Sequence, residues 1–276
     1  MKTKKTVNQK LKRIFLSLLL PAAMTASVTC NAQNNSGIPP HQMRVASYNI
    51  QHGMGMDNQL NYKRIAEVLR AISPDVVALQ EVDSMTQRTN NTYALGEIAE
   101  QLNYYASYAP AIDFEGGKYG IGILSRERPI SVRQYALPGS DEARTLLVAE
   151  FDDFVFASTH LSLTEADRIA SIGIIEEAAK KSGKPFVVAG DLNAQPDSPF
   201  IRQFEEKFQI CSGKQKSWPA DKPTECLDYI AAYKRKSTSK NGNGGAQQPA
   251  VTLFSDVLNT QASDHRPIVA EIVLPR

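Results

Sequence analysis

The stretch Val76-Val77-Ala78-Leu79-Gln80-Glu81-Val82 places four apolar residues directly before an amide and a carboxylate. A short apolar run that follows a Ser-Pro pair is typical of a buried strand, and it predicts a strand over 75–79. An acidic side chain at the end of such a strand is either a solvated surface residue or a group that a rigid scaffold presents for chemistry. Glu81 is therefore the first candidate site residue.

The same pattern continues on both sides of this stretch. Apolar residues spaced by three and four predict amphipathic helices over about 60–72 and 165–181, and the spacing recurs from Leu95 to Leu102. Further apolar runs predict strands over 44–50, 121–124, 144–151, 154–159, 185–190, 227–231 and 268–273. Alternating strands and helices indicate an α/β protein, but their order alone leaves the topology open. Residues 233–250 are rich in Lys, Ser, Asn and Gly and predict a long loop.

Polar side chains of unusual chemistry lie at the ends of these predicted strands or directly after them. They are Asn49, Gln80, Glu81, His160, Asp191, Asn193, Asp228, Asp264 and His265. Each residue alone could be an ordinary turn or loop residue, because Asp and Asn favour turns. Together, at strand ends, they indicate one site that is assembled by the sheets.

The chemistry of this set suits a hard divalent cation. Mg²⁺, Mn²⁺ and Ca²⁺ prefer oxygen ligands, and Glu81, Asn49, Asp191, Asn193 and Asp264 could supply them. Zinc is disfavoured, because the sequence has no closely spaced His/Cys cluster.

The histidines could complete a hydrolytic site. An imidazole held by a carboxylate works as a general base or as a phosphate clamp, and His160 and His265 could do this with Asp228. Phosphate-ester hydrolysis needs such groups to neutralise phosphoryl charge, orient water and stabilise the leaving oxygen.

Seven short motifs in one order resemble the endonuclease/exonuclease/phosphatase superfamily, which includes deoxyribonucleases, apurinic endonucleases, sphingomyelinases and inositol polyphosphate 5-phosphatases. The motifs are Ser47-Tyr48-Asn49-Ile50, residues 76–82, Tyr119-Gly120-Ile121-Gly122-Ile123-Leu124-Ser125-Arg126, Ser158-Thr159-His160-Leu161, Gly190-Asp191-Leu192-Asn193, Leu227-Asp228-Tyr229-Ile230 and Ser263-Asp264-His265-Arg266-Pro267-Ile268. Each motif is weak on its own, whereas seven in order are specific. The resemblance covers about Arg44 to Val273.

This resemblance implies an α/β fold with four layers, in which two packed mixed β-sheets are flanked by helices. It also implies a hydrolase of phosphate esters, a phosphodiesterase or phosphatase, that uses Mg²⁺ or else Mn²⁺ or Ca²⁺. On the same basis Glu81 and Asn49 hold the metal, with Asp264 as an auxiliary acid. Asp191 and Asn193 orient the attacking water and the phosphate.

The resemblance assigns the remaining roles as well. His265, its carboxylate partner Asp228 and His160 are catalytic. His160, Tyr119 and Arg144 also contact the substrate phosphate, together with the Asn193 amide. The alternatives are core packing for Tyr119 and a surface ion pair for Arg144. A histidine at position 160 also disfavours the branch that repairs abasic sites.

His52 follows Asn49 closely and is a weaker candidate. It either lines the substrate pocket or is an ordinary loop residue.

The first 32 residues have the layout of a bacterial export signal. A basic segment precedes an apolar run over 14–26 and small residues that end at Cys30-Asn31-Ala32. Cleavage after Ala32 and lipid modification of Cys30 are rival forms of processing, and an N-terminal membrane anchor is the further alternative. The sequence thus predicts a signal over 1–32, a linker over 33–42 and a single domain over 43–276, located in the periplasm or anchored in the bacterial envelope.

Charge and cysteine content bear on partners and compartment. Six of the 31 basic side chains lie in 1–32, so 25 remain against 29 acidic ones, a formal net charge of −4. An acidic body disfavours duplex DNA as a substrate, so we expect the enzyme to act on a small or lipid-linked phosphate ester. We also expect the protein to be a monomer. A secreted deoxyribonuclease is the alternative, and a catalytically inactive binding module is more remote. Cys211 and Cys226 are either disulfide-bonded or two buried thiols.

Overall fold

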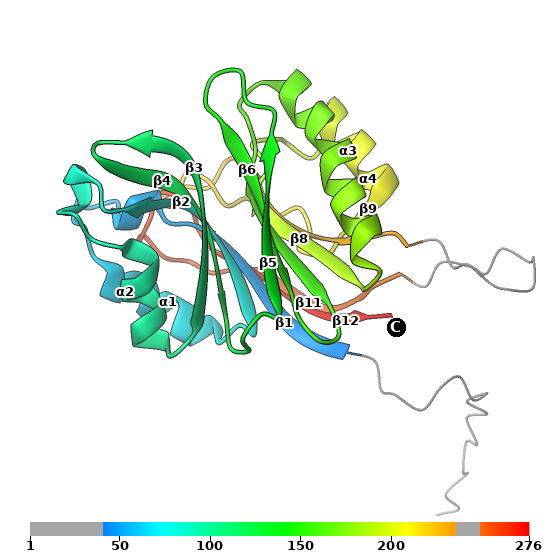
Figure 1. The fold of residues 1–276 in the computed structure, drawn as a ribbon, viewed down its shortest axis with the longest axis horizontal. Helices are drawn as coiled ribbons and strands as arrows, with labels where there is room; N and C mark the ends of the chain where they lie inside the picture. The colour runs from blue at the N-terminus through cyan, green and yellow to red at the C-terminus, as the bar shows by residue number, and fades with distance from the viewer. Residues whose placement is uncertain (1–40, 236–248, 276) are drawn as a thin grey trace, which may run out of the picture. The chain divides into compact units, whose positions relative to one another are not determined.

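The computed structural model describes residues 41–235 and 249–275, which form two six-stranded sheets (Figure 1). The first sheet has the order β11 (Val251–Val257), β12 (Ile268–Leu274), β1 (His41–Asn49), β2 (Val76–Ser84), β4 (Gly117–Ser125) and β3 (Tyr105–Phe114). The second has the order β5 (Ser131–Leu137), β6 (Arg144–Glu150), β7 (Val155–His160), β8 (Phe186–Asp191), β10 (Asp228–Tyr233) and β9 (Phe208–Ile210). Both sheets are mixed, since β1–β2 and β7–β8 are parallel and the other pairs are antiparallel.

Four helices cover the outer faces of the sheets. The helices α1 (Tyr62–Ile72) and α2 (Ala94–Leu102) pack on the first sheet, and α3 (Glu165–Ser182) and α4 (Pro199–Lys207) pack on the second (Figure 1). Short 3₁₀ turns lie at Gln51–Gly53 and Gln87–Thr89.

Alternation along each strand explains the layering. Val76 of β2 joins a buried cluster with Leu147 of β6 and Val187 of β8, so this cluster lies between the sheets. The next residue, Val77, points the other way and packs in the cluster of α1, which contains Ile65. Successive side chains of a strand point to opposite faces, and strands covered on both faces are apolar throughout. The predicted four-layer α/β sandwich is confirmed.

Local signals set the helix boundaries. The Asn61 side chain accepts a hydrogen bond from the Arg64 N–H and caps α1, which ends at a left-handed Ser73 before Pro74. Ser198 caps α4 in the same way, with Pro199 in its first turn.

Several elements were not predicted from the sequence. The edge strands β3 and β5, the short β9 and the helix α4 were missed, and β2 continues beyond residue 79 to Ser84. Most side chains of β3 and β5 are partly or fully exposed, so these strands lack a continuous apolar run.

Some predictions fall on residues that the structure does not describe. The export signal over 1–32, with Cys30, lies outside the described residues, and so does most of the linker. His41 and Gln42, expected in that linker, belong to β1. Of the predicted loop over 233–250, residues 236–248 are likewise outside, and a strand resumes at Val251 as expected. In the described part of the chain, no helix is long and apolar enough to cross a membrane.

The two cysteines that the structure describes are separate buried thiols. Cys211 lies in the cluster between the sheets, whereas Cys226 lies in the cluster under α3 and α4. Burial raises the pKa of both thiols. Of the two alternatives, free thiols are observed.

Candidate active site

Strand register places three candidate residues in one row across the second sheet. Asp191 ends β8, and it pairs with His160 of β7 on one side and with Asp228 of β10 on the other. All three side chains are buried. The row therefore gathers two carboxylates and an imidazole at one edge of the sheet, as the strand-end pattern predicted.

The carboxylate of Asp191 is the centre of the site. Its Oδ2 lies 3.2 Å from Asn49 Nδ2, 3.6 Å from His160 Nε2 and 3.7 Å from His265 Nε2. Its Oδ1 accepts a hydrogen bond of 2.9 Å from the backbone N–H of Asn193. Asn49 belongs to the first sheet, so this carboxylate joins the two sheets.

Glu81 reaches the same place from the first sheet. Asn49 Nδ2 lies 2.9 Å from Glu81 Oε1, and Glu81 sits in a β-bulge of β2 with a left-handed φ of 56°. A bulge redirects a side chain, and a left-handed φ in a non-glycine residue is strained. Burial raises the pKa of Glu81 to about 7; Asn49 opposes this shift, whereas Asp264 and Asp191 add to it.

His265 is paired with Asp228. The Nδ1 of His265 lies 2.9 Å from Asp228 Oδ2, which also accepts a hydrogen bond of 2.5 Å from Ser217 Oγ. Burial alone lowers the pKa of His265, but Asp228, Asp191 and Asp264 outweigh it and raise the pKa to about 10. The ring is therefore an imidazolium at neutral pH.

His160 has the opposite character. Burial lowers its pKa to about 4, and Arg144 lowers it further against the influence of Asp191. One histidine of the site is thus neutral and the other is charged, and a difference of this kind separates acid and base roles.

Two further candidates, Asn193 and Asp264, form hydrogen bonds with residues next to the site. The Asn193 side chain donates to the Leu161 carbonyl at 2.8 Å, so its amide nitrogen is engaged with the backbone. Asp264 Oδ1 lies 3.2 Å from Ser263 Oγ, which also donates to the Asn49 carbonyl at 2.9 Å. Through Ser263, Asp264 is therefore connected to Asn49, which contacts both Glu81 and Asp191.

The two remaining phosphate candidates line the side of the site nearest to β4 and β6. Arg144 is buried, its Nη1 lies 3.1 Å from Glu142 Oε1, and its Nε has no hydrogen-bond partner among the described residues. Burial raises the pKa of Tyr119, and Glu81 and Glu142 raise it further while Arg144 lowers it. Tyr119 therefore lies within electrostatic reach of both Glu81 and the Glu142–Arg144 pair.

The acidic groups fit a divalent cation. Ligand atoms of Asp191, Asp228 and His265 lie within 4.8 Å of one another, and all three residues are buried. This group differs from the predicted ligands Glu81, Asn49 and Asp264, and its His265–Asp228 pair is already hydrogen-bonded. The pKa of Glu81 is raised because burial and the charges of Asp264 and Asp191 disfavour its ionised form, which a bound cation would stabilise.

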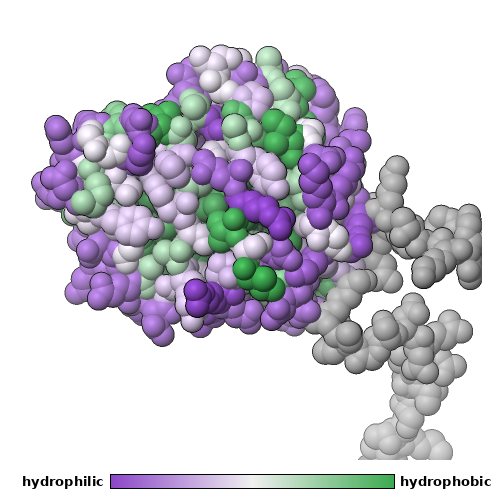
Figure 2. All heavy atoms as spheres, in the orientation of Figure 1, coloured by the Kyte–Doolittle hydropathy of each residue, from purple (hydrophilic) through white to green (hydrophobic). Residues whose placement is uncertain are grey.

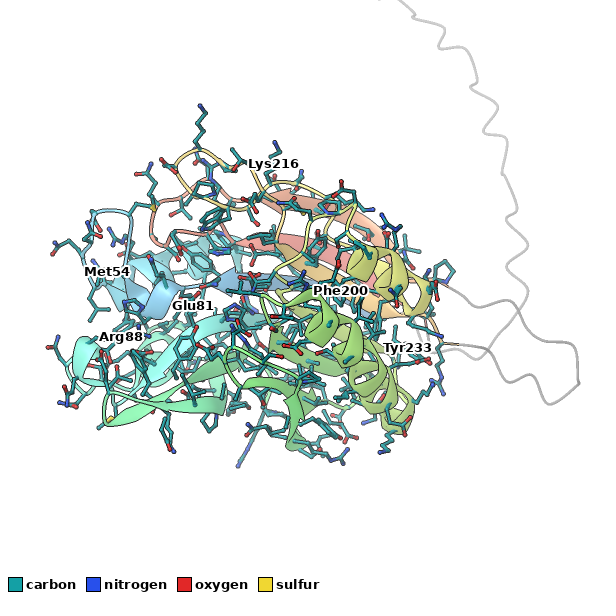
Figure 3. All side chains as sticks on the ribbon, turned by 90° about the horizontal axis from the view of Figure 1, so that it is seen from above. Met54, Glu81, Arg88, Phe200, Lys216 and Tyr233 are labelled. Atoms are coloured by element: carbon teal, nitrogen blue, oxygen red, sulfur yellow. The ribbon has the colours of Figure 1, made fainter. Side chains whose placement is uncertain are left out.

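The structure adds residues that the sequence did not single out. Asp83 is buried on β2 and its carboxylate binds the Nε and Nη2 of Arg88 at 2.7 and 2.8 Å. Figure 3 shows Arg88 outward from Glu81, at the same end of the molecule. His52, a weaker candidate, is half-buried with a left-handed φ of 46°. The position of Asp83 two residues after Glu81 was the only sequence signal for this group.

Known proteins share the family and the fold of this chain. Residues 46–265 match the Endonuclease/Exonuclease/phosphatase family. A family protein from Bacteroides thetaiotaomicron is 17% identical, with a TM-score of 0.69 and coverage of 87% of this chain and 100% of that chain. A protein of the same family from Beutenbergia cavernae is 21% identical, with a TM-score of 0.64 and coverage of 84% and 72%.

A mannosyl-6-phosphatase from Bacteroides thetaiotaomicron is 17% identical, with a TM-score of 0.66 and coverage of 84% of this chain and 99% of that chain. At these identities the solved structures establish the fold alone. Among curated protein sequences, none matches this chain. The family match, however, spans most of the chain and includes every candidate site residue. The chain therefore belongs to the endonuclease/exonuclease/phosphatase family of hydrolases that act on phosphate esters.

Proposed function

We propose that this protein is a divalent-metal-dependent hydrolase of small or lipid-linked phosphate esters, in which water attacks phosphorus. The observation that carries the proposal is the convergence of Asn49, His160 and His265 on one oxygen of Asp191. Carboxylates from two sheets meet there beside one charged and one neutral histidine, which suits the attack of water on a phosphoryl group.

Glu81 and Asn49, with Asp264 beside them, would hold Mg²⁺ or another hard divalent ion. When bound, this ion would supply charge neutralisation to the phosphoryl oxygens. Asp191 would orient the attacking water and accept its proton, and the support is that the Asn193 N–H fixes its Oδ1. Its Oδ2, on which Asn49, His160 and His265 converge, is the oxygen that would contact the water.

The remaining side chains would bind the phosphate. The His265 imidazolium supplies a positive charge and an N–H donor, and Asp228 fixes its orientation through Nδ1. The unpartnered buried Nε of Arg144 is a donor that a phosphoryl oxygen would satisfy. His160, as a neutral ring, can donate one hydrogen bond without adding charge.

A substrate panel tests this function. The protein starting after residue 32 is assayed with and without Mg²⁺ on sphingomyelin, phosphoinositides, a mannose phosphate, bis-p-nitrophenyl phosphate and duplex DNA. We include the mannose phosphate because one protein of this fold is a mannosyl-6-phosphatase. We expect kcat/KM to be higher on a small or lipid ester than on DNA, and chelation to abolish activity. Faster cleavage of DNA would favour the nuclease alternative, and no hydrolysis of any ester would favour the inactive module.

We also propose that the protein is exported and remains in the periplasm or at the envelope. The support is the basic and apolar layout of residues 1–32. Fractionation of the producing cell followed by mass spectrometry of the N-terminus tests it. A mature chain that starts after Ala32, or at a lipid-modified Cys30, is the expected result, whereas full-length protein in the cytosol contradicts it.

A further inference from the structure

Arg88 is held rigidly beside the candidate active site. The Asp83 carboxylate that binds its Nε and Nη2 is fully buried and also accepts a hydrogen bond of 2.6 Å from Thr86 Oγ1. The backbone N–H of Arg88 donates to Glu115 at 2.8 Å. A guanidinium fixed through a buried carboxylate presents its remaining N–H groups in a defined plane.

The free part of this guanidinium is available to a ligand. Nη1 of Arg88 has no hydrogen-bond partner in the ranges that the structure describes, and 30% of the side chain is exposed. The positive charge is partly offset by Asp83. A bound group would therefore be selected by hydrogen-bond geometry as well as by charge.

Arg88 lies near Tyr119, one of the residues expected to contact the substrate phosphate. Asp83 pairs with Tyr119 in the β2–β4 register, and it follows Glu81 by two residues. The Arg88 Cζ lies 5.6 Å from the ring centre of Tyr119 and 4.4 Å from that of Phe114. Tyr119 thus lies next to Arg88 and within electrostatic reach of the Glu81 carboxylate.

His52 lies in the turn after β1, within electrostatic reach of Arg88 and Asp83. Its Nδ1 is buried and has no hydrogen-bond partner among the described residues. Burial lowers its pKa and Arg88 lowers it further, whereas Asp83 and Asp264 raise it. Its left-handed backbone is strained, and such strain is concentrated at functional sites.

We propose that Arg88 and His52 form a second anion subsite, which takes another phosphate group of the substrate beside the scissile ester. The inference rests on the proposed phosphate-ester hydrolysis and narrows its substrate class to molecules with two phosphates. The fork of Arg88 matches phosphate oxygens, and the unpartnered His52 nitrogen adds a second polar contact.

Calorimetry with inert probes tests the subsite without requiring turnover. The probes are methylphosphonate, phosphonoacetate, methylenediphosphonate and propylenediphosphonate, in the same Mg²⁺ buffer. A diphosphonate should bind the wild type more tightly than methylphosphonate does. In Arg88→Lys, which keeps the charge and loses the fork, this advantage should fall by about ten- to a hundredfold.

Arg126→Lys is the matched control. Arg126 also lies over an aromatic ring, with Cζ 5.4 Å from the Tyr104 ring centre, and pairs with Asp75 at 3.5 Å, but it follows the opposite end of β4. Chelation of Mg²⁺ by the probes affects all variants alike. If Arg88→Lys proves unstable in thermal melts, Asp83→Asn combined with Arg88→Gln keeps a neutral hydrogen-bonding pair and replaces it.

The outcomes separate the two proposals. If diphosphonate binds more tightly than methylphosphonate by the same factor in the wild type and in the Arg88 variant, the subsite is overturned. It is also overturned if only phosphonoacetate gains affinity from Arg88, because the subsite would then bind a carboxylate and not a phosphate. Absence of hydrolysis on every ester would refute the proposed function, while the probe ratio would still decide the subsite.

Discussion

At the scale of single residues, Glu81 carries a charge that the fold alone does not stabilise. Its pKa in the folded protein is raised to about 7, and its ordinary value is 4.5. A raised acid pKa means that the folded state holds its proton longer than the unfolded chain. The free energy of unfolding should therefore decrease as pH rises from about 4.5 through about 7.

Glu81→Gln removes this charge and keeps the shape of the side chain. Without metal, we expect the variant to melt at a higher temperature than the wild type at about pH 8, and the difference to vanish at about pH 4. With Mg²⁺ or Mn²⁺, calorimetry should show weaker binding by at least about tenfold, because a hard cation loses its carboxylate. Unchanged metal binding would remove Glu81 from the metal site.

His265 and Asp228 should act as a unit. Their contact of 2.9 Å orients the ring and holds its charge, so each single alanine variant should lose about 10²–10⁴ in kcat. The double variant should be little worse than the worse single variant, because groups that act together are not additive.

The protonation of His265 gives an independent readout of the same pair. NMR titration should place its pKa near 10 in the wild type and lower in Asp228→Asn. Losses that multiply across the double-mutant cycle, together with an unshifted titration, would disprove the coupling.

At the scale of elements, the close approach of β7 and β8 sets the row of catalytic candidates. A Cβ at Gly190 would lie 2.0 Å from the Thr159 carbonyl oxygen, so a side chain at this position would force β8 away from β7. Gly190→Ala should lower both the melting temperature and kcat, since Asp191 and His160 follow directly in the two strands.

Gly173→Ala is the control for this change. Gly173 is exposed on α3 and a Cβ there would meet nothing within 4 Å. The substitution should raise the free energy of unfolding by roughly 0.5–1 kcal/mol and leave kcat unchanged. A Gly190→Ala protein as stable and active as the wild type would show that the strands can separate without disturbing the site.

At the scale of the whole molecule, the site joins the two sheets. Asn49 and Glu81 come from the first sheet, whereas Asp191 and Asp228 come from the second, and the cluster between the sheets has apolar side chains from both. On the face seen in Figure 2, apolar residues form small patches among polar ones. The contacts at the site are therefore polar links between layers that are otherwise held by burial.

A cation held by Glu81 and Asn49 should stabilise the first sheet directly and the second through the contact between Asn49 and Asp191. At a free Mg²⁺ concentration of about a hundred times Kd, the free energy of unfolding should rise by about 2.7 kcal/mol. Hydrogen exchange should then slow in β2 and in β8. Protection confined to the first sheet would mean that the contact between Asn49 and Asp191 does not transmit the effect to the second, and Glu81→Gln should abolish the protection in both.

The sequence by itself determined the inner strands and the chemistry of the site. Strands such as β2 and β8 are covered on both faces, so they appear as unbroken apolar runs, and the polar residues at their ends are the ones that meet. The edge strands β3 and β5 could not be found in the same way, because their exposed side chains carry little periodic signal.

Only the tertiary structure decided how these groups behave. His160 and His265 look alike in the sequence, yet burial beside Arg144 lowers the pKa of one and three carboxylates raise that of the other. The register across β7, β8 and β10 and the bulge at Glu81 decide which atoms meet at Asp191. The Arg88 guanidinium is oriented by the buried carboxylate of Asp83. Protonation and rigidity depend on neighbours that are distant along the chain, and a linear pattern of residues does not encode those distances.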